Sequence, residues 1–180
     1  TAHYSFPVKR NEFLLVTSPF GMRGDPINPD KQQIHKGIDI QTNREAVLAT
    51  EDKGKVVAVN LNANTPGGRS VTVEYERADN SKVQVSYHHL EAVGVKTGDT
   101  VNAGLQLGVS GNTGTRTTGE HLHLEVKQIH ADGTLREVNP AAYLAEIAQK
   151  GNIGLQLLSD GKDLLAKFRT QGNEAPAIGP

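Results

Sequence analysis

The sequence predicts a mainly β fold built on an antiparallel sheet, and three observations lead to this prediction. Val56–Val59, Ser70–Tyr75 and Lys82–Tyr87 combine β-branched residues with alternation, which is typical of strands. Ala78–Asn80 supplies turn residues between the last two segments, so these are expected to form a hairpin. Glu120–Val126 alternates strictly between polar and apolar side chains, which predicts a further strand with one buried face.

Two short helices are expected near the C-terminus. Asn139 is a suitable cap and Pro140 suits a first helical position, so Ala141–Lys150 is predicted to be a helix that ends at Gly151. A second helix is expected over Lys162–Arg169, because its leucines and phenylalanine recur at helical spacing.

Length and charge are those of a compact domain with a real core. The chain has 180 residues, no cysteine and a net charge of −1, with acidic and basic residues interspersed. This composition has neither the basic footprint of a nucleic-acid-binding protein nor an apolar run long enough to span a membrane. The start at Thr1 carries no initiator methionine or signal-peptide pattern, so we interpret it as a trimmed or processed end.

Histidine and aspartate side chains form the main candidate site. His35 and Asp39 lie four residues apart, and His121 and His123 lie two apart, so each pair shares a face if its segment is extended. Hydrolytic zinc sites use three protein ligands, and without cysteine these must be imidazoles and carboxylates. A His-x-His pair alone is more often part of a polar strand surface, so the surrounding motifs decide between the two interpretations.

Four segments carry longer motifs: Ser18–Arg23 with His35–Ile40, Tyr87–Leu90, Val109–Gly114 with Thr118–Glu125, and Asn139–Leu144. In this order and spacing they resemble the signatures of the lysostaphin/LytM-type zinc metallopeptidases, which cut peptide stems or bridges of bacterial peptidoglycan. The resemblance implies an antiparallel sheet with an open groove. It further implies a peptidase domain over residues 18–144, which leaves an N-terminal extension over 1–17. The C-terminal part lies outside the resemblance, and its residues predict a helical extension over 145–170 and a disordered tail over 171–180.

Position by position, the resemblance assigns Zn²⁺ to His35, Asp39 and His123, and the catalytic roles to His89 and His121. It implies a zinc endopeptidase that acts on peptidoglycan peptides in the periplasm, the cell envelope or outside the cell. Glu125 is either a group that orients a metal-bound histidine or a solvated strand residue.

The neighbouring residues His88 and His89 are expected to face opposite ways on a strand, so only one should enter the groove. The family register selects His89, and a bend or bulge near the strand end would be needed to aim it there. His88 is then expected at the surface.

The alternative function is a cell-wall module that has no activity of its own, or is autoinhibited, and activates other peptidoglycan hydrolases. The presence of all the inferred ligands and both catalytic histidines favours the enzyme. Val95–Gly104 also resembles a turn of lipoyl and biotinyl carrier domains, but neither Lys96 nor Lys127 lies in a carrier-like hairpin tip.

Overall fold

A computed structural model describes residues 3–9, 13–18, 20–24, 32–77, 79–115 and 119–166, without the side chains of 21–24 and 32–35. Its centre is a sheet of twelve strands, in which β14-β13-β1-β4-β11-β8-β7-β6-β9 follow one another and β5, β10 and β12 branch from this path. A separate two-stranded sheet holds β2 and β3. The sheet is antiparallel except between β1 and β13, which confirms the predicted mainly β, antiparallel fold.

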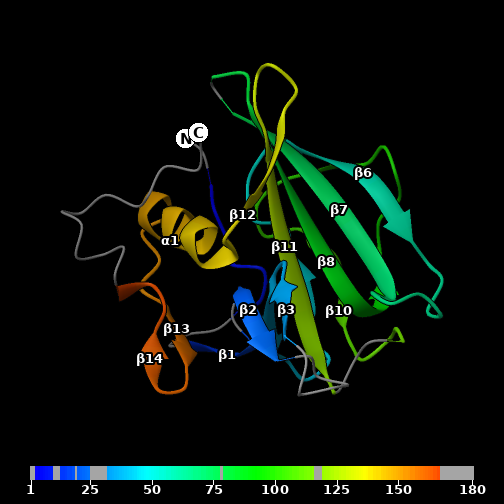
Figure 1. Ribbon diagram of the computed structural model, residues 1–180. Helices are drawn as coiled ribbons and strands as arrows, with labels where there is room; N and C mark the ends of the chain where they lie inside the picture. The colour runs from blue at the N-terminus through cyan, green and yellow to red at the C-terminus, as the bar shows by residue number, and fades with distance from the viewer. Residues whose placement is uncertain are drawn as a thin grey trace.

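The strands are β1 Phe13–Ser18, β2 Gly21–Gly24, β3 Gln32–His35, β4 Ile38–Gln41, β5 Ala46–Leu48, β6 Gly54–Asn60, β7 Arg69–Glu76, β8 Lys82–Val93, β9 Thr100–Val101, β10 Gln106–Ser110, β11 His121–Ile129, β12 Leu135–Val138, β13 Gln156–Ser159 and β14 Lys162–Asp163. Their arrangement is shown in Figure 1.

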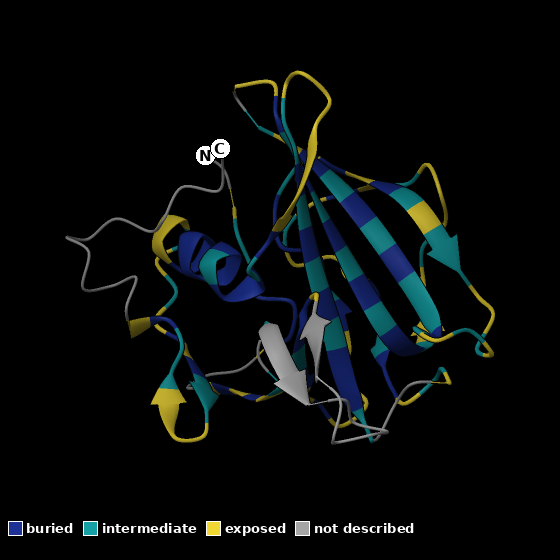
Figure 2. Cartoon of the chain, in the orientation of Figure 1, coloured by how far each residue is buried: buried dark blue, intermediate teal, exposed yellow. Residues whose placement is uncertain are grey.

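The long central strands bury one face. Buried and half-buried residues alternate along β7, β8 and β11, which Figure 2 shows as bands across the strands. In β11 the buried positions Leu122, Leu124 and Val126 belong to the main hydrophobic core. The polar residues between them therefore lie on the opposite face, as the alternation predicts.

Helix α1 spans Pro140–Lys150. The Asn139 side chain accepts a hydrogen bond from the backbone N–H of Ala141, and Gly151 follows the last turn, which confirms the predicted cap, start and end. The helix buries Tyr143, Leu144 and Ile147 against the sheet. No described helix has the length and apolar character of a membrane span.

The second predicted helix is wrong over its first residues. Lys162 and Asp163 form β14, which pairs with β13, the turn Leu164–Leu165 follows, and Ala166, the last described residue, is helical. The Asp163 carboxylate accepts hydrogen bonds from the backbone N–H groups of Leu157 and Leu165, and these contacts favour a hairpin over a helix. Residues 167–180, which include the tail expected to be disordered, lie outside the described part.

The N-terminal segment expected to be an extension contributes to the central sheet. β1 lies between β4 and β13, and its Leu14 and Val16 enter the main core. Apolar side chains that alternate along β1 account for this place in the sheet.

Candidate metal and catalytic site

Strand pairing brings the candidate histidines and aspartate to one face of the sheet. In β11, His121, His123 and Glu125 point away from the core residues. On the neighbouring strand β4, Gln41 is the partner of His121 and Asp39 is the partner of His123. Directly opposed residues of two strands share a face, so Asp39 and both histidines line the same side.

Asp39 lies at the centre of this group. Its Oδ1 atom is 2.7 Å from His123 Nδ1 and 3.6 Å from His121 Nε2. The side chains of all three residues are mostly buried, with exposed fractions between 11% and 16%. An ionised carboxylate with this little access to water must be compensated by its neighbours, and here His123 Nδ1, at hydrogen-bond distance, does so.

The turn between β3 and β4 packs closely against β11 at the site. A Cβ atom on Gly37 would lie 2.3 Å from the Leu124 carbonyl oxygen and 3.0 Å from His123 Nε2. Only glycine lets the backbone approach β11 this closely. Since Lys36 and Gly37 separate β3 from β4, His35 and Asp39 do not belong to one continuous strand. The backbone of His35 pairs with Gly21, and its side chain lies outside the described part.

Glu125 and His88 complete the surroundings of His123. Glu125 Oε2 lies 3.6 Å from His123 Nε2 and 3.0 Å from His88 Nε2. The His123 ring thus has a carboxylate on each side. Burial lowers the pKa of His123, but the hydrogen bonds and charges of Asp39 and Glu125 outweigh it and raise the pKa to about 9.

The position of His88 differs from the prediction that this residue lies at the surface. Its side chain is 21% exposed, it is the partner of His123 in the β8–β11 pair, and the two rings lie 5.4 Å apart in an edge-to-face arrangement. The sequence did not predict the contact between His88 and Glu125, because a single sequence does not reveal which residues face each other across strands.

His89 also reaches the site, because the backbone turns there. It has φ = 64°, and the β7–β8 register shifts between Arg69 and Val71, which confirms that the strand bends near its end. The His89 ring lies 4.6 Å from that of His121 and 6.0 Å from that of His123. The expectation that only one of the two adjacent histidines faces the groove is therefore wrong, since strict alternation ends where φ becomes positive.

Backbone carbonyls fix the tautomers of His89 and His121. His89 Nδ1 lies 2.6 Å from the Thr113 carbonyl oxygen, and His121 Nδ1 lies 2.6 Å from that of Gly119. A carbonyl only accepts, so in each neutral ring Nδ1 carries the proton and Nε2 has the lone pair. Burial is the main cause that lowers the pKa of His89 to about 4, so this ring is neutral at pH 7.

The donors fit a zinc ion. Asp39 Oδ1 and His123 Nδ1 point at each other. The other ring nitrogen of His123, Nε2, faces the Glu125 carboxylate, which is the usual support of a metal-bound histidine. Of the three predicted ligands, the described side chains include Asp39 and His123. No group of three or more potential ligands is found among the described residues.

The sequence matches a known family. Residues 33–140 match Peptidase family M23. The chain is 35% identical over 136 residues to an uncharacterized metalloprotease of Haemophilus influenzae, and the aligned residues make up 75% of this chain and 26% of that protein. It is 35% identical over 121 residues to the peptidoglycan DD-endopeptidase ShyB of Vibrio cholerae, and the aligned residues make up 67% of this chain and 26% of that protein. The chain thus spans about a quarter of the length of these two relatives.

Solved structures share the fold. The catalytic domain of the antimicrobial peptidase lysostaphin from Staphylococcus simulans aligns with a TM-score of 0.56 and 28% identity, over 72% of this chain and 90% of that one. A zinc-containing peptidase from Vibrio cholerae aligns with a TM-score of 0.59 and 28% identity, over 77% of this chain and 39% of that one. These likenesses confirm the lysostaphin-type fold, and because the family match covers more than half of the sequence, the chain belongs to peptidase family M23.

Proposed function

We propose that this protein is a zinc-dependent endopeptidase that hydrolyses peptide bonds in the cross-links or stem peptides of bacterial peptidoglycan. The observation that carries the proposal is the convergence of Asp39, His89, His121 and His123 on one sheet face. Membership of family M23 and the likeness to a peptidoglycan DD-endopeptidase support the same reaction and substrate. The catalytic unit in this proposal spans residues 18–144.

In this proposal His35, Asp39 and His123 hold the zinc. When bound, zinc lowers the pKa of a coordinated water towards neutrality and polarises the scissile carbonyl. Glu125 keeps the His123 ring in place by its contact with Nε2, so that Nδ1 faces Asp39. A proton and a metal ion compete for Nδ1, and zinc binding should therefore release a proton.

His89 and His121 would move the protons of the reaction. In its neutral form each ring has Nε2 as the acceptor nitrogen, because the Nδ1 proton is engaged by a backbone carbonyl. Either ring, once protonated, has a donor for the oxyanion or for the leaving amine. The low pKa of His89 favours it as the neutral acceptor at pH 7.

The substrate implies the place of action. Peptidoglycan lies outside the cytoplasm, so we place the protein in the periplasm or cell envelope, or outside the cell.

The test is hydrolysis of purified peptidoglycan by the zinc-loaded protein, with the released fragments identified by mass spectrometry. The variants Asp39→Asn, His121→Ala and His123→Ala should abolish release, and His130→Ala, a histidine outside the site, should not. Zinc content should fall in the Asp39 and His123 variants only. Absence of release by protein that holds one zinc per chain would refute the endopeptidase and identify a binding or activating module.

A further inference from the structure

Two exposed apolar side chains lie beside the candidate site on β1. Phe13 is 40% exposed and Leu15 is 42% exposed, whereas their neighbours Leu14 and Val16 are in the core. Large apolar side chains are costly to leave in water, and two on the same strand face form an apolar patch that is a candidate binding surface.

This patch lies on the face of the sheet that carries Asp39 and His121. Val16 of β1 pairs with Ile40 of β4, both on the core side. One residue further along this antiparallel register, Leu15 lies beside Gln41, and Gln41 is the cross-strand partner of His121. A row across three strands therefore leads from Leu15 through Gln41 to His121.

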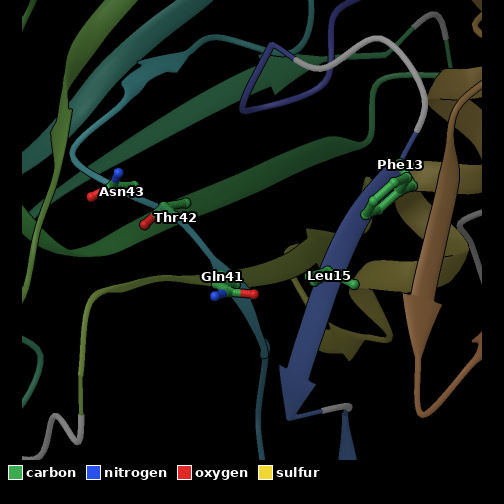
Figure 3. A pocket seen from close by; sticks show the side chains of 5 residues that line it. All are labelled: Phe13, Leu15, Gln41, Thr42 and Asn43. Atoms are coloured by element: carbon green, nitrogen blue, oxygen red, sulfur yellow. The ribbon is translucent and has the colours of Figure 1, made fainter.

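A hollow of about 210 Å³ begins at the Leu15–Gln41 end of this row and is lined by Phe13, Leu15, Gln41, Thr42 and Asn43. Figure 3 shows Leu15 and Gln41 at the same level of neighbouring strands, with Phe13 further along β1. None of the lining side chains is charged, and they combine two apolar groups with two amides, whereas the Thr42 hydroxyl oxygen is buried. Such a surface suits an apolar side chain whose backbone amide groups find hydrogen-bond partners nearby.

The spacing sets the position of the substrate residue. Neighbouring strands lie about 4.8 Å apart, so Leu15 is roughly 10 Å from His121, and an extended peptide covers this in about three residues. We propose that Phe13 and Leu15 form a specificity subsite that binds an apolar side chain of the peptide substrate about three residues from the scissile bond. This inference rests on the proposed function, because the substrate must cross the site at His121.

The chain contains no tryptophan, which allows a direct reporter. We would introduce Leu15→Trp into the inactive His121→Ala protein and follow its emission during titration with soluble muropeptides, released from purified peptidoglycan by a muramidase. The matched control is Leu135→Trp in the same background, since Leu135 is an exposed leucine of β12, 58% accessible. We expect a saturable blue shift for Leu15→Trp and none for the control.

A kinetic variant provides the second measurement. Leu15→Gln should raise KM for the same muropeptides about tenfold with kcat within about twofold, because a contact outside the reacting centre contributes uniform binding. Leu135→Gln should leave both constants unchanged, and the unfolding midpoint of each variant shows whether it folds.

The outcomes separate the subsite from the reaction. If the wild type cleaves the muropeptides but Leu15→Trp shows no shift and Leu15→Gln has wild-type KM, the subsite is refuted and the proposed function stands. If the wild type does not cleave them, the proposed function fails, and a saturable shift at Leu15→Trp would still support peptide binding. Emission that is already blue-shifted without ligand, or that depends on protein concentration, would show that the chain itself or a second copy covers the patch and would overturn the subsite.

Discussion

A buried arginine joins three parts of the fold, and its removal is the sharpest test of how the helix is attached. Arg77, which follows β7, donates from Nη2 to Glu51 at 3.0 Å and from Nη1 to Glu146 of α1 at 2.6 Å. The side chain of Arg77 is 15% exposed and each carboxylate 8%. Arg77→Met keeps most of the aliphatic stem and removes the charge, so it isolates the electrostatic contribution.

The expected cost follows from the carboxylates left behind. Loss of one partner from a buried ion pair lowers the free energy of unfolding by about 3–5 kcal/mol. The same cost can be worked out from protonation of a carboxylate that has lost its partner. A carboxyl with an ordinary pKa of 4.5 takes up a proton at pH 7 at a cost of about 3.4 kcal/mol. In a domain of this size a loss of 3–5 kcal/mol lowers the unfolding midpoint by about 6–20 °C.

The cost should depend on pH. Burial raises the pKa of Glu51, and Arg77 and the Tyr143 hydroxyl act against this rise. A raised folded-state pKa means that the contribution of Glu51 is fully present below about pH 4.5 and is lost as pH rises through the folded pKa. Removal of Arg77 raises that pKa further, so the loss extends to higher pH. At pH 5, protonation of one such carboxyl costs only about 0.7 kcal/mol, and the effect of Arg77→Met should shrink accordingly.

The assay is urea unfolding followed by circular dichroism at pH 5 and pH 7, with Arg44→Met as the control. Arg44 makes an equally short contact, 2.7 Å to Glu120, but its side chain is 55% exposed. An exposed pair contributes little, so Arg44→Met should leave the unfolding midpoint nearly unchanged. Equal effects of the two variants at pH 7, or a larger effect of Arg77→Met at pH 5 than at pH 7, would refute the reasoning.

Three further substitutions test local contacts through the thermal midpoint. Gly68→Ala should lower the thermal midpoint clearly more than Gly98→Ala. Both glycines have positive φ, but an added Cβ lies 2.4 Å from the Thr113 carbonyl oxygen at Gly68 and meets nothing within 4 Å at Gly98. Equal effects of the two substitutions would contradict this. Asn139→Ala removes the α1 cap and should cost about 1 kcal/mol, and an unchanged midpoint would show that the cap is dispensable. Tyr143→Phe removes a buried hydroxyl bonded to Thr50 and Glu51 and should cost about 1–3 kcal/mol, whereas a neutral result would mean that these partners pair elsewhere.

Local patterns in the sequence correctly predict which side chains of β11 face the candidate site. Strict alternation in β11 correctly separates His121 and His123 from Leu122 and Leu124, because strand geometry alone determines which face a residue takes. The same reasoning fails at His88 and His89, where a positive φ at His89 interrupts the alternation. Alternation is a property of regular strands, and a single sequence contains no signal for where this strand bends.

Contacts between distant segments were not predictable. Asn139, Pro140 and Gly151 predict α1 correctly because caps act within one turn of the helix. Lys162 and Asp163 form a hairpin with β13 and not the first residues of the predicted second helix, because β13 pairs with β1 more than 140 residues earlier in the chain. Arg77 likewise meets Glu146 only after folding, and nothing in either neighbourhood indicates the pairing.

Both ends of the main strand path are very short. The path ends at β14 with Lys162 and Asp163 on one side and at β9 with Thr100 and Val101 on the other. Long, flat, apolar edges recruit strands from other molecules, whereas two-residue edges, here with charged side chains at β14, offer little to extend. Deletion of the hairpin that follows α1 would instead leave β1 as an open edge with Phe13 and Leu15 on its face. The β13–β14 hairpin, which follows the family match, thus covers a strand edge that would otherwise be free to pair with another molecule.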